Sequence, residues 1–303
     1  MPVAAILGPQ SSARPLEAFE RAARAEWTSV VEQADAIVVF GGDGTVHRHI
    51  RDLVEFGVPV LLVPAGSGND FARALGLRRL GDSLLAWRQF TSGAGNVRTV
   101  DLGVIHEAAR LGPILAGTVP PNRHYFCSVA GVGLDAGIAR RASLLPRWMR
   151  AHGGYLLAAP PEFLRFKPVP MSVCREAGAR APYEPTMLVA VGNAPVWGGG
   201  MKIAPRAELD DGKLDLCIVR AMSRFRLFCW FPTVYFGGHV RSPKVEYVQS
   251  ASARIETARP LEVYADGEYI CQTPVEFSVA RRALRVIVPA SSLPGDTAGA
   301  GKC

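Results

Sequence analysis

Two stretches decide the fold: AIVVFGGDGT at residues 36–45 and VPVLLVPAGSGNDFA at residues 58–72. Each is a short apolar run followed by a glycine-rich turn and a segment of helical character, and VAAIL at residues 3–7 opens a similar unit. Strands that alternate with helices in this way are typical of a parallel sheet with crossover helices. We therefore expect an α/β nucleotide-binding domain over residues 1–103.

From about residue 104 the sequence changes to strand-like runs separated by Gly, Pro, Asn and Asp, which predicts a mainly antiparallel β-sandwich domain over residues 104–290. The expected strands are residues 124–130, 186–191, 214–219, 261–265 and 284–288. A helical insert is expected at about residues 133–166, with Pro146, Pro160 and Pro161 breaking or restarting its helices. The tail, residues 291–303, is rich in Gly, Ala and Ser and is expected to be disordered.

Composition narrows the class of protein. A chain of 303 residues favours two domains, because single cores stop growing near about 250 residues. No segment has the ~20 consecutive apolar residues of a membrane span, and no signal peptide is evident, so we expect a soluble cytoplasmic protein. The net charge of +7 suits nucleic acid, anionic lipid headgroups or a polyphosphate alike. The six cysteines have no metal-ligand spacing and are expected to be buried thiols.

The glycine-rich turns are candidate phosphate loops. Glycines let backbone amides approach a phosphate closely, and a following helix N-terminus adds partial positive charge. Taken alone, a tight glycine-rich βα turn explains the first loop equally well. A dinucleotide-binding GxGxxG is excluded because His47 stands where the third glycine is needed, and no GxxxxGK[ST] occurs.

The two loops follow neighbouring strands, so they can face one crevice at the carboxyl ends of the sheet and together bind one nucleotide. Asp43 and Asp70 place carboxylates there, where Mg²⁺ would need oxygen ligands, although such acids are more often turn or cap residues.

Here the sequence resembles a known family. GGDGT followed by PAGSGNDFAR at residues 64–73 is similar to the signature of the diacylglycerol kinase and sphingosine kinase family, whereas NAD kinases and phosphofructokinases share only a related GGDGT loop. A long segment of the second half, Gly192-Asn193 and then WGGGMKIAPRAELDDGKLDL at residues 197–216, resembles the second domain of these lipid kinases. The resemblance extends over roughly residues 36–288.

The resemblance implies a set of site residues. It makes Glu268 the acceptor of the proton of the attacking lipid hydroxyl, with Asp266 beside it, although Asp266-Gly267-Glu268 by itself reads as a hairpin turn. The implied ATP-binding residues are Gly41, Gly42, Asp43, Gly44, Thr45, Gly66, Ser67, Gly68, Asn69, Asp70, Phe71, Ala72 and Thr99. The implied Mg²⁺ site uses Asp211, with Glu208 and Lys213 contributing backbone carbonyls.

The implied activity is ATP-dependent phosphorylation of a lipid hydroxyl, with diacylglycerol as the leading substrate. Sphingoid bases, ceramide and other lipid alcohols stay open, as do an NAD-kinase-like nucleotide kinase and an ATP-binding regulator without catalysis. The expected partner is a lipid substrate at the inner face of the membrane, which the protein reaches by peripheral contact. We expect no nucleic-acid partner. A homodimer is suggested only by what is common in the family. Residues 138–150, IARRASLLPRWMR, suit either an interfacial segment or an amphipathic helix that covers the core.

The sequence departs from the family pattern in three places. The first turn and the connection before GGDGT are short, which predicts a smaller first sheet. Val46-His47-Arg48 stands where relatives often carry an acid or an Asn-Glu pair, and Pro160-Pro161 stands where they often keep a continuous apolar helix.

Overall fold

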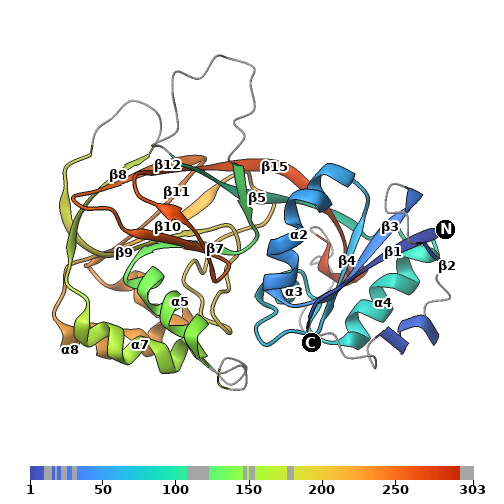
Figure 1. Ribbon diagram of the computed structural model, residues 1–303, viewed down its shortest axis with the longest axis horizontal. Helices are drawn as coiled ribbons and strands as arrows, with labels where there is room; N and C mark the ends of the chain where they lie inside the picture. Colours follow the sequence, from blue (N-terminus) through green and yellow to red (C-terminus); the bar gives the residue numbers. More distant parts are fainter. Residues whose placement is uncertain are drawn as a thin grey trace, which may run out of the picture. The chain divides into compact units, whose positions relative to one another are not determined.

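The computed structural model describes residues 1–9, 16–17, 19–21, 26–28, 33–107, 123–145, 149, 154–175 and 181–293. The chain forms two compact units: unit 1 comprises residues 1–100 and the C-terminal stretch from Arg282, and unit 2 comprises Asp101–Arg281 (Figure 1). The expected boundaries placed residues 282–290 with the second domain. They cluster with unit 1 because strand β15 (Val275–Ile287) ends there, pairing Val286 with Val60.

Unit 1 is built on parallel strands. β1 (Pro2–Leu7), β3 (Ala36–Gly41) and β4 (Val60–Pro64) pair in the order β4-β3-β1, and β2 (Glu26–Trp27) lies beyond β1. The run AIVVF is buried at all five positions, as expected of a parallel strand that is covered on both faces. Three helices pack with these strands: α2 (Asp43–Phe56), α3 (Asp70–Ala74) and α4 (Leu80–Thr91). This arrangement confirms the predicted α/β domain.

Unit 2 is a largely antiparallel sheet structure, in the order β14-β13-β7-β9-β8-β12-β15, with β10 joined to β9 and β11 to β10. Its strands are β5 (Val97–Glu107), β6 (Arg123–Phe126), β7 (Val129–Gly133), β8 (Val169–Arg175), β9 (Glu184–Gly192), β10 (Leu214–Arg220), β11 (Val245–Ser250), β12 (Ser252–Thr257), β13 (Glu262–Ala265) and β14 (Glu268–Gln272). The predicted β-rich second domain is thereby confirmed.

The central strands of unit 2 are apolar on both faces. On β10, Leu216 and Ile218 enter one hydrophobic core with other strand residues, while Cys217 and Val219 enter a second core shared with helices. Side chains alternate between the two faces of a strand, so burial on both sides requires a continuous apolar run.

The second core is closed by helices that lie together on one side of the sheet of unit 2 (Figure 1). They are α5 (Leu134–Leu144), α7 (Gly154–Arg165), α8 (Arg224–Trp230) and the 3₁₀ segments η3 (Phe231–Phe236) and η4 (Gly238–Arg241). Within residues 138–150, α5 buries Ile138, Ala139 and Ala142, as an amphipathic helix covering the core would; residues 146–148 and 150 lie outside the described part.

Several expectations need correction. Pro160 and Pro161 lie inside α7 and do not end it. Each proline removes one backbone hydrogen bond, but the buried face with Ala158, Ala159 and Phe163 packs against the core and supports the helix. The strand expected at residues 124–130 is two strands, because the backbone turns between β6 and β7.

Two smaller expectations also change. Ser291 and Ser292 belong to a 3₁₀ turn, η5 (Ala290–Ser292), so the predicted disorder does not begin at residue 291; residues 294–303 lie outside the described part. Among the described cysteines, Cys229 is exposed and Cys174 half-buried, while the other three are buried as expected. No described helix is long and apolar enough to cross a bilayer.

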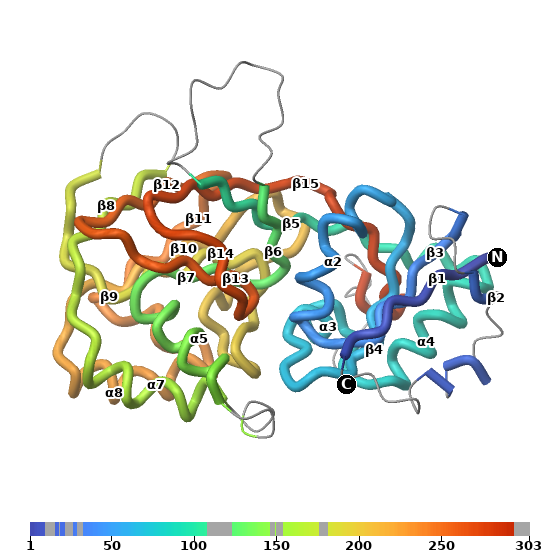
Figure 2. The backbone as a smooth tube through the Cα atoms, in the orientation of Figure 1, coloured from blue at the N-terminus to red at the C-terminus, as the bar shows by residue number. Residues whose placement is uncertain are grey.

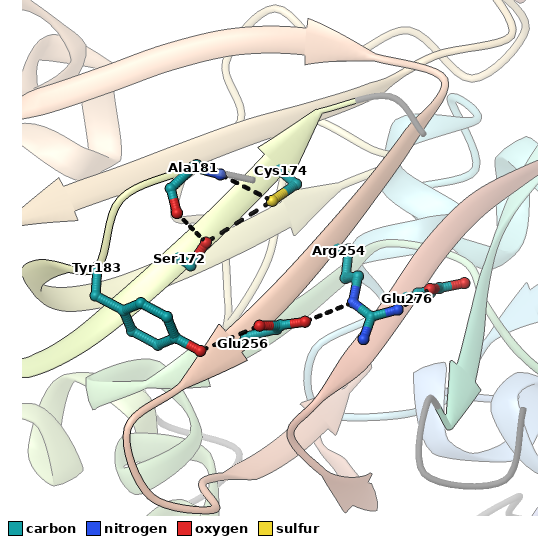
Figure 3. A network of polar contacts seen from close by, with 7 residues as sticks. All are labelled: Ser172, Cys174, Ala181, Tyr183, Arg254, Glu256 and Glu276. Atoms are coloured by element: carbon teal, nitrogen blue, oxygen red, sulfur yellow. Dashed lines mark hydrogen bonds and ion pairs between the residues drawn. The ribbon is translucent and has the colours of Figure 1, made fainter. Parts of the chain in front are cut away.

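An exposed polar network joins strands β12 and β15 with Tyr183, the residue before β9 (Figure 3). Arg254 pairs with Glu256 and Glu276, each at 2.8 Å, and the Tyr183 hydroxyl donates to Glu256 at 3.1 Å. Solvent-exposed ion pairs of this kind each contribute little to the free energy of unfolding. We therefore assign this network no more than a minor part in the stability of the sheet.

Candidate functional site

The two glycine loops meet at the carboxyl ends of β3 and β4. The Ala65 N–H donates to the Gly41 carbonyl at 3.0 Å, which continues the strand pairing into the loops. A Cβ added to Gly66 would lie 2.5 Å from the Gly42 Cα, and one added to Gly42 would lie 2.8 Å from the Gly66 Cα. No side chain fits at this contact, so glycine is required in both loops for the backbones to approach this closely.

Thr45 is enclosed by glycines. Its side chain is 7% exposed, and a Cβ on Gly8 or on Gly41 would collide with its hydroxyl. Gly8 follows β1 and donates its N–H to the Phe40 carbonyl at 2.8 Å. The turn after the first strand therefore belongs to the same group of loops. The 14-residue helix α2 starts within this group, at Asp43, and its N-terminal end carries a partial positive charge.

The side chains of the loops hold each other in place. The Asp43 carboxylate accepts the Asp70 N–H at 3.0 Å through Oδ2 and the Phe71 N–H at 3.1 Å through Oδ1, so it caps α3. Asn69 has a left-handed φ of 54° and exchanges two hydrogen bonds with Gly66, one accepted by Oδ1 at 3.0 Å and one donated by Nδ2 at 2.7 Å. Asp70 is buried, with Oδ1 3.7 Å from the Arg73 guanidinium.

These contacts bring together most of the predicted ATP-binding residues. Residues 41–45 and 66–72 form one cluster in unit 1, whereas Thr99 lies half-buried on β5 and outside the two loops. The carboxylate of Asp43 orders the second loop, and two amides of that loop, those of Asp70 and Phe71, are donors to Asp43. In this structure Asp43 is thus a positioning residue.

The second set of predicted residues lies in unit 2, on the hairpin of β13 and β14, traced in red shades in Figure 2. Asp266, in the left-handed region at φ 50°, accepts the N–H groups of Cys127 and Ser128, both at 2.8 Å, and of Val129 at 3.3 Å. Its own N–H donates to the Val129 carbonyl at 3.0 Å. Asp266 therefore fastens the hairpin to the link between β6 and β7.

Glu268 is the first residue of β14, and its side chain is exposed. Gly267 precedes it with φ 89°, a conformation that favours glycine. The sequence suggested both a hairpin turn and a functional carboxylate for Asp266-Gly267-Glu268. The structure shows the hairpin turn, with one acid anchored to backbone amides and the other presented to solvent.

A chain of buried hydrogen bonds links this hairpin to the loop at residues 208–213. The Asn193 side-chain amide donates to the carbonyls of Asp101, at 3.0 Å, and Cys127, at 2.9 Å. The buried Asp101 carboxylate accepts the Gly212 N–H at 2.7 Å. Since Cys127 also donates to Asp266, the two loops implied by the family resemblance are held by one network.

The predicted metal residues lie on the loop at residues 208–213. Asp211 accepts the Lys213 N–H at 2.9 Å and the Gln249 side-chain amide at 3.4 Å, while Glu208 and Lys213 are exposed. Within the described ranges, no three or more His, Cys, Asp or Glu side chains are grouped to hold a metal. The donor set fits Mg²⁺ only in a site with one carboxylate, backbone carbonyls and water, which is a mode that this ion accepts.

Beneath the helices of unit 2 lies a cavity with about 670 Å³ of empty space, including its mouth toward solvent. Aliphatic and aromatic side chains from α5, α7, α8 and η3 form about half of its wall, and apolar side chains of strands and loops form most of the rest. Its titratable lining residues are Asp135, Tyr155 and His239. Tyr155 also reaches the hairpin of β13 and β14, because its hydroxyl lies 3.3 Å from the position of a Cβ on Gly267. The apolar cavity and the turn that carries Glu268 are therefore neighbours.

The polar groups in this wall are deeply buried. Burial raises the pKa of the Asp135 carboxyl to about 7, and a Cβ on Gly131 would collide with this carboxyl. His239 is 4% exposed, its Nε2 lies 3.1 Å from the Ile203 carbonyl and its Nδ1 has no partner among the described residues. Burial lowers the pKa of His239, so the ring is neutral at pH 7.

Sequence reasoning missed Asp135, Tyr155 and the anchoring role of Asp101. Asp135 follows an apolar strand and begins a helix, where an acid is ordinary, so nothing in its neighbourhood distinguishes it. Asp101 alone carried a usable signal, since it is an acid inside the apolar run VDLGVI at residues 100–105.

Comparison with known proteins agrees with both halves of the chain. Residues 8–105 match the family described as the diacylglycerol kinase catalytic domain, and residues 128–288 match the YegS C-terminal NAD kinase beta sandwich-like domain. A diacylglycerol kinase of Mycobacterium tuberculosis is 31% identical over 86% of this chain and 79% of its own length, and one of Bacillus subtilis is 25% identical over 86% and 80%. A diacylglycerol kinase structure from Bacillus anthracis superimposes with a TM-score of 0.65 at 20% identity, covering 96% of this chain and 98% of that one, which shows the shared fold.

The contact between the glycine loops gives a first prediction. Gly66→Ala places a methyl group against the Gly42 backbone, so we expect a loss of about 1–3 kcal/mol in the free energy of unfolding of unit 1. Gly81→Ala is the matched control, because a Cβ there meets nothing within 4 Å and alanine is the better helix former. Urea denaturation measures both variants. Equal stability of Gly66→Ala and Gly81→Ala would show that the loops do not touch.

A second prediction concerns pH. The pKa of Asp135 rises from 3.8 in the unfolded chain to about 7 in the folded protein, so its stabilising effect is complete below the unfolded pKa and is lost as pH rises through about 7. Between about pH 5 and pH 8 the wild type should lose about 3 kcal/mol relative to Asp135→Asn, which cannot ionise. Denaturant titrations at the two pH values measure this difference, with Asp52→Asn, at an exposed residue, as the control. Parallel pH profiles for all three proteins would contradict the burial of an ionisable Asp135.

Proposed function

This chain belongs to the diacylglycerol kinase family, and from that premise we propose that it transfers the γ-phosphoryl group of ATP to the hydroxyl of diacylglycerol, giving phosphatidic acid. Family membership makes the chain a lipid kinase. Diacylglycerol as the acceptor is supported by the names of the relatives from Mycobacterium tuberculosis and Bacillus subtilis.

One observation carries the choice of a lipid acceptor: an apolar cavity adjoins the hairpin that presents Glu268. The wall of the cavity contains Ile138, Phe163 and Leu227 with many similar side chains, and Tyr155 connects it to Gly267. Such a wall stabilises a hydrocarbon chain by removing it from water, at about 0.8 kcal/mol for each buried methylene. A nucleotide acceptor would instead leave its sugar and phosphate groups without polar partners there.

The nucleotide is proposed to bind at the glycine loops of unit 1. Backbone groups of residues 41–45 and 66–68, together with the N-terminal end of α2, provide the close approach and the positive potential that phosphates require. Asp43 and Asn69 keep the loops in shape through their hydrogen bonds to Asp70, Phe71 and Gly66. Mg²⁺ would be held by the Asp211 side chain and the carbonyls of Glu208 and Lys213. It would supply charge neutralisation on the transferred phosphoryl group.

The proposed step is an in-line displacement. The lipid hydroxyl oxygen forms a bond to the γ-phosphorus, the bond from that phosphorus to the oxygen bridging to the β-phosphate breaks, and ADP leaves. The hydroxyl proton passes to the carboxylate of Glu268, which acts as general base late in the transition state. Asp266 does not exchange protons in this scheme. Its hydrogen bonds to Cys127 and Ser128 hold the turn from which Glu268 projects.

The apolar lining of this cavity does not distinguish diacylglycerol from other lipid alcohols. A sphingoid base, ceramide or another lipid alcohol also combines a hydroxyl with an apolar chain, and these remain alternatives. The apolar cavity argues against an NAD-kinase-like activity. An exposed carboxylate on an anchored turn argues against a regulator without catalysis. Since the substrate resides in a bilayer, we propose peripheral association with the inner face of the membrane.

The test is transfer of labelled phosphate from [γ-³²P]ATP to diacylglycerol, sphingosine or ceramide in detergent micelles. Glu268→Gln should lower kcat by about 10²- to 10⁴-fold and leave ATP affinity unchanged, because it removes the proton acceptor only. Glu262→Gln, on the preceding strand of the same hairpin, is the matched control and should keep wild-type activity. Label in sphingosine or ceramide alone would replace diacylglycerol as the substrate. Tight ATP binding without label in any lipid would overturn the proposal.

A further inference from the structure

The helices that roof the cavity also carry the largest group of exposed apolar side chains described in unit 2. On α7 these are Leu156, Leu157 and Leu164, with exposed fractions of 48–55%, and on α8 and η3 they are Phe225, Phe228 and Phe236. Phe225 and Phe236 are 80% and 86% exposed. Single exposed apolar side chains are ordinary, but several gathered on neighbouring helices are typical of a surface that contacts something apolar.

These side chains belong to one packed group of helices. Phe163 of α7 contacts Phe228 of α8 and Phe231 of η3, with ring centroids 5.2 Å and 4.9 Å apart. The same helices face the cavity with Tyr155, Phe163, Leu227 and Phe231. They therefore present one apolar side to the cavity and another to solvent, and we call the solvent side the α7–α8–η3 surface.

The charges on this surface have one sign. Residues 221–244 contain no Asp or Glu, whereas they contain Arg224, Arg226, Arg241 and Lys244. Arg224 and Arg226 flank Phe225 on α8 and are exposed, and no described carboxylate forms an ion pair with either. The acidic residue of α7, Glu162, is buried and pairs with Arg141 at 2.7 Å, so it does not offset these charges.

From this combination we propose that the α7–α8–η3 surface docks the protein onto an anionic lipid bilayer. Exposed Phe and Leu side chains enter the boundary between headgroups and acyl chains, and arginines beside them attract anionic headgroups. A second copy of the chain is a poorer occupant, because a symmetric contact would bring like-charged arginines together. The purpose of docking rests on the proposed function. Docking would place the helices that cover the cavity against the bilayer that contains the lipid substrate.

The experiment is flotation of the purified full chain with phosphatidylcholine vesicles, with and without phosphatidylglycerol, in the absence of ATP and diacylglycerol. Wild type should bind the anionic vesicles, and added salt should weaken this binding. The double variant Phe225→Ser, Phe236→Ser should bind at least about tenfold more weakly to the anionic vesicles, because it removes two aromatic anchors. Neither phenylalanine lines the cavity, so the fold and the active site stay intact.

A second variant isolates the charge. Arg224→Gln with Arg226→Gln should lower binding to phosphatidylglycerol vesicles by about tenfold and reduce the salt dependence. Leu85→Ser and Arg88→Gln, at exposed positions of α4 in unit 1, are the matched controls and should bind as wild type. Binding that is unchanged in both double variants, or lost equally in the controls, would overturn the docking surface.

Kinase activity separates this inference from the proposed function. With a short-chain diacylglycerol dispersed in detergent micelles, the Phe225→Ser, Phe236→Ser variant should keep wild-type activity, while on vesicles it should lose it in proportion to binding. Wild-type protein that binds vesicles and phosphorylates no lipid would leave docking standing and reject the reaction. A variant that changes the sedimentation coefficient from dimer to monomer and leaves vesicle binding unchanged would assign the surface to self-association and reject docking.

Discussion

The candidate site depends on buried or half-buried aspartates whose carboxylates accept backbone N–H groups. Asp43 holds the start of α3, Asp101 holds Gly212, and Asp266 holds the link between β6 and β7. Loop amides away from regular pairing must find acceptors, and a charged acceptor gives bonds about twice as strong as neutral ones. These hydrogen bonds hold in place the turns that lead into α3, β7 and β14 and the loop at residues 208–213.

This constraint gives the two acids of one motif different surroundings. In Asp266-Gly267-Glu268 the first acid is committed to amides at 2.8 Å, and the third is left in solvent. These different surroundings agree with the proposed roles, in which Asp266 holds the turn and Glu268 accepts the proton of the lipid hydroxyl. In the glycine loops Asp43 likewise accepts backbone amides, those of Asp70 and Phe71.

The sequence predicted the fold to the level of its elements, because the strands of unit 1 and the central strands of unit 2 are apolar runs bounded by glycine and proline. The prediction was wrong where contacts between residues far apart in the sequence determine the local structure. Pro160 and Pro161 remain inside α7 because Phe163 and its neighbours pack against a core formed by distant strands. The sequence predicted which residues belong to the candidate site but not the part that each one has. No local pattern indicates that the carboxylates of Asp43 and Asp266 accept backbone N–H groups of distant loops. The burial of Asp135 could not be predicted from the sequence, since it depends on contact with Gly131 and on helices far along the chain.

In the proposed function, the cavity in unit 2 separates a lipid acceptor from a nucleotide acceptor. Glycine loops and a βα turn are suited to ATP in either case, so unit 1 alone does not choose between them. In that proposal the choice comes from a wall of aromatic and aliphatic groups near the hairpin of Glu268. Its three titratable residues are the buried Asp135 and His239 and the half-buried Tyr155. A charged acceptor would lose its hydration there without gaining partners, while a hydrocarbon chain would gain from the same transfer. Under the proposed function, the elements that line this cavity set the choice of acceptor, and that choice can change without altering the glycine loops of unit 1.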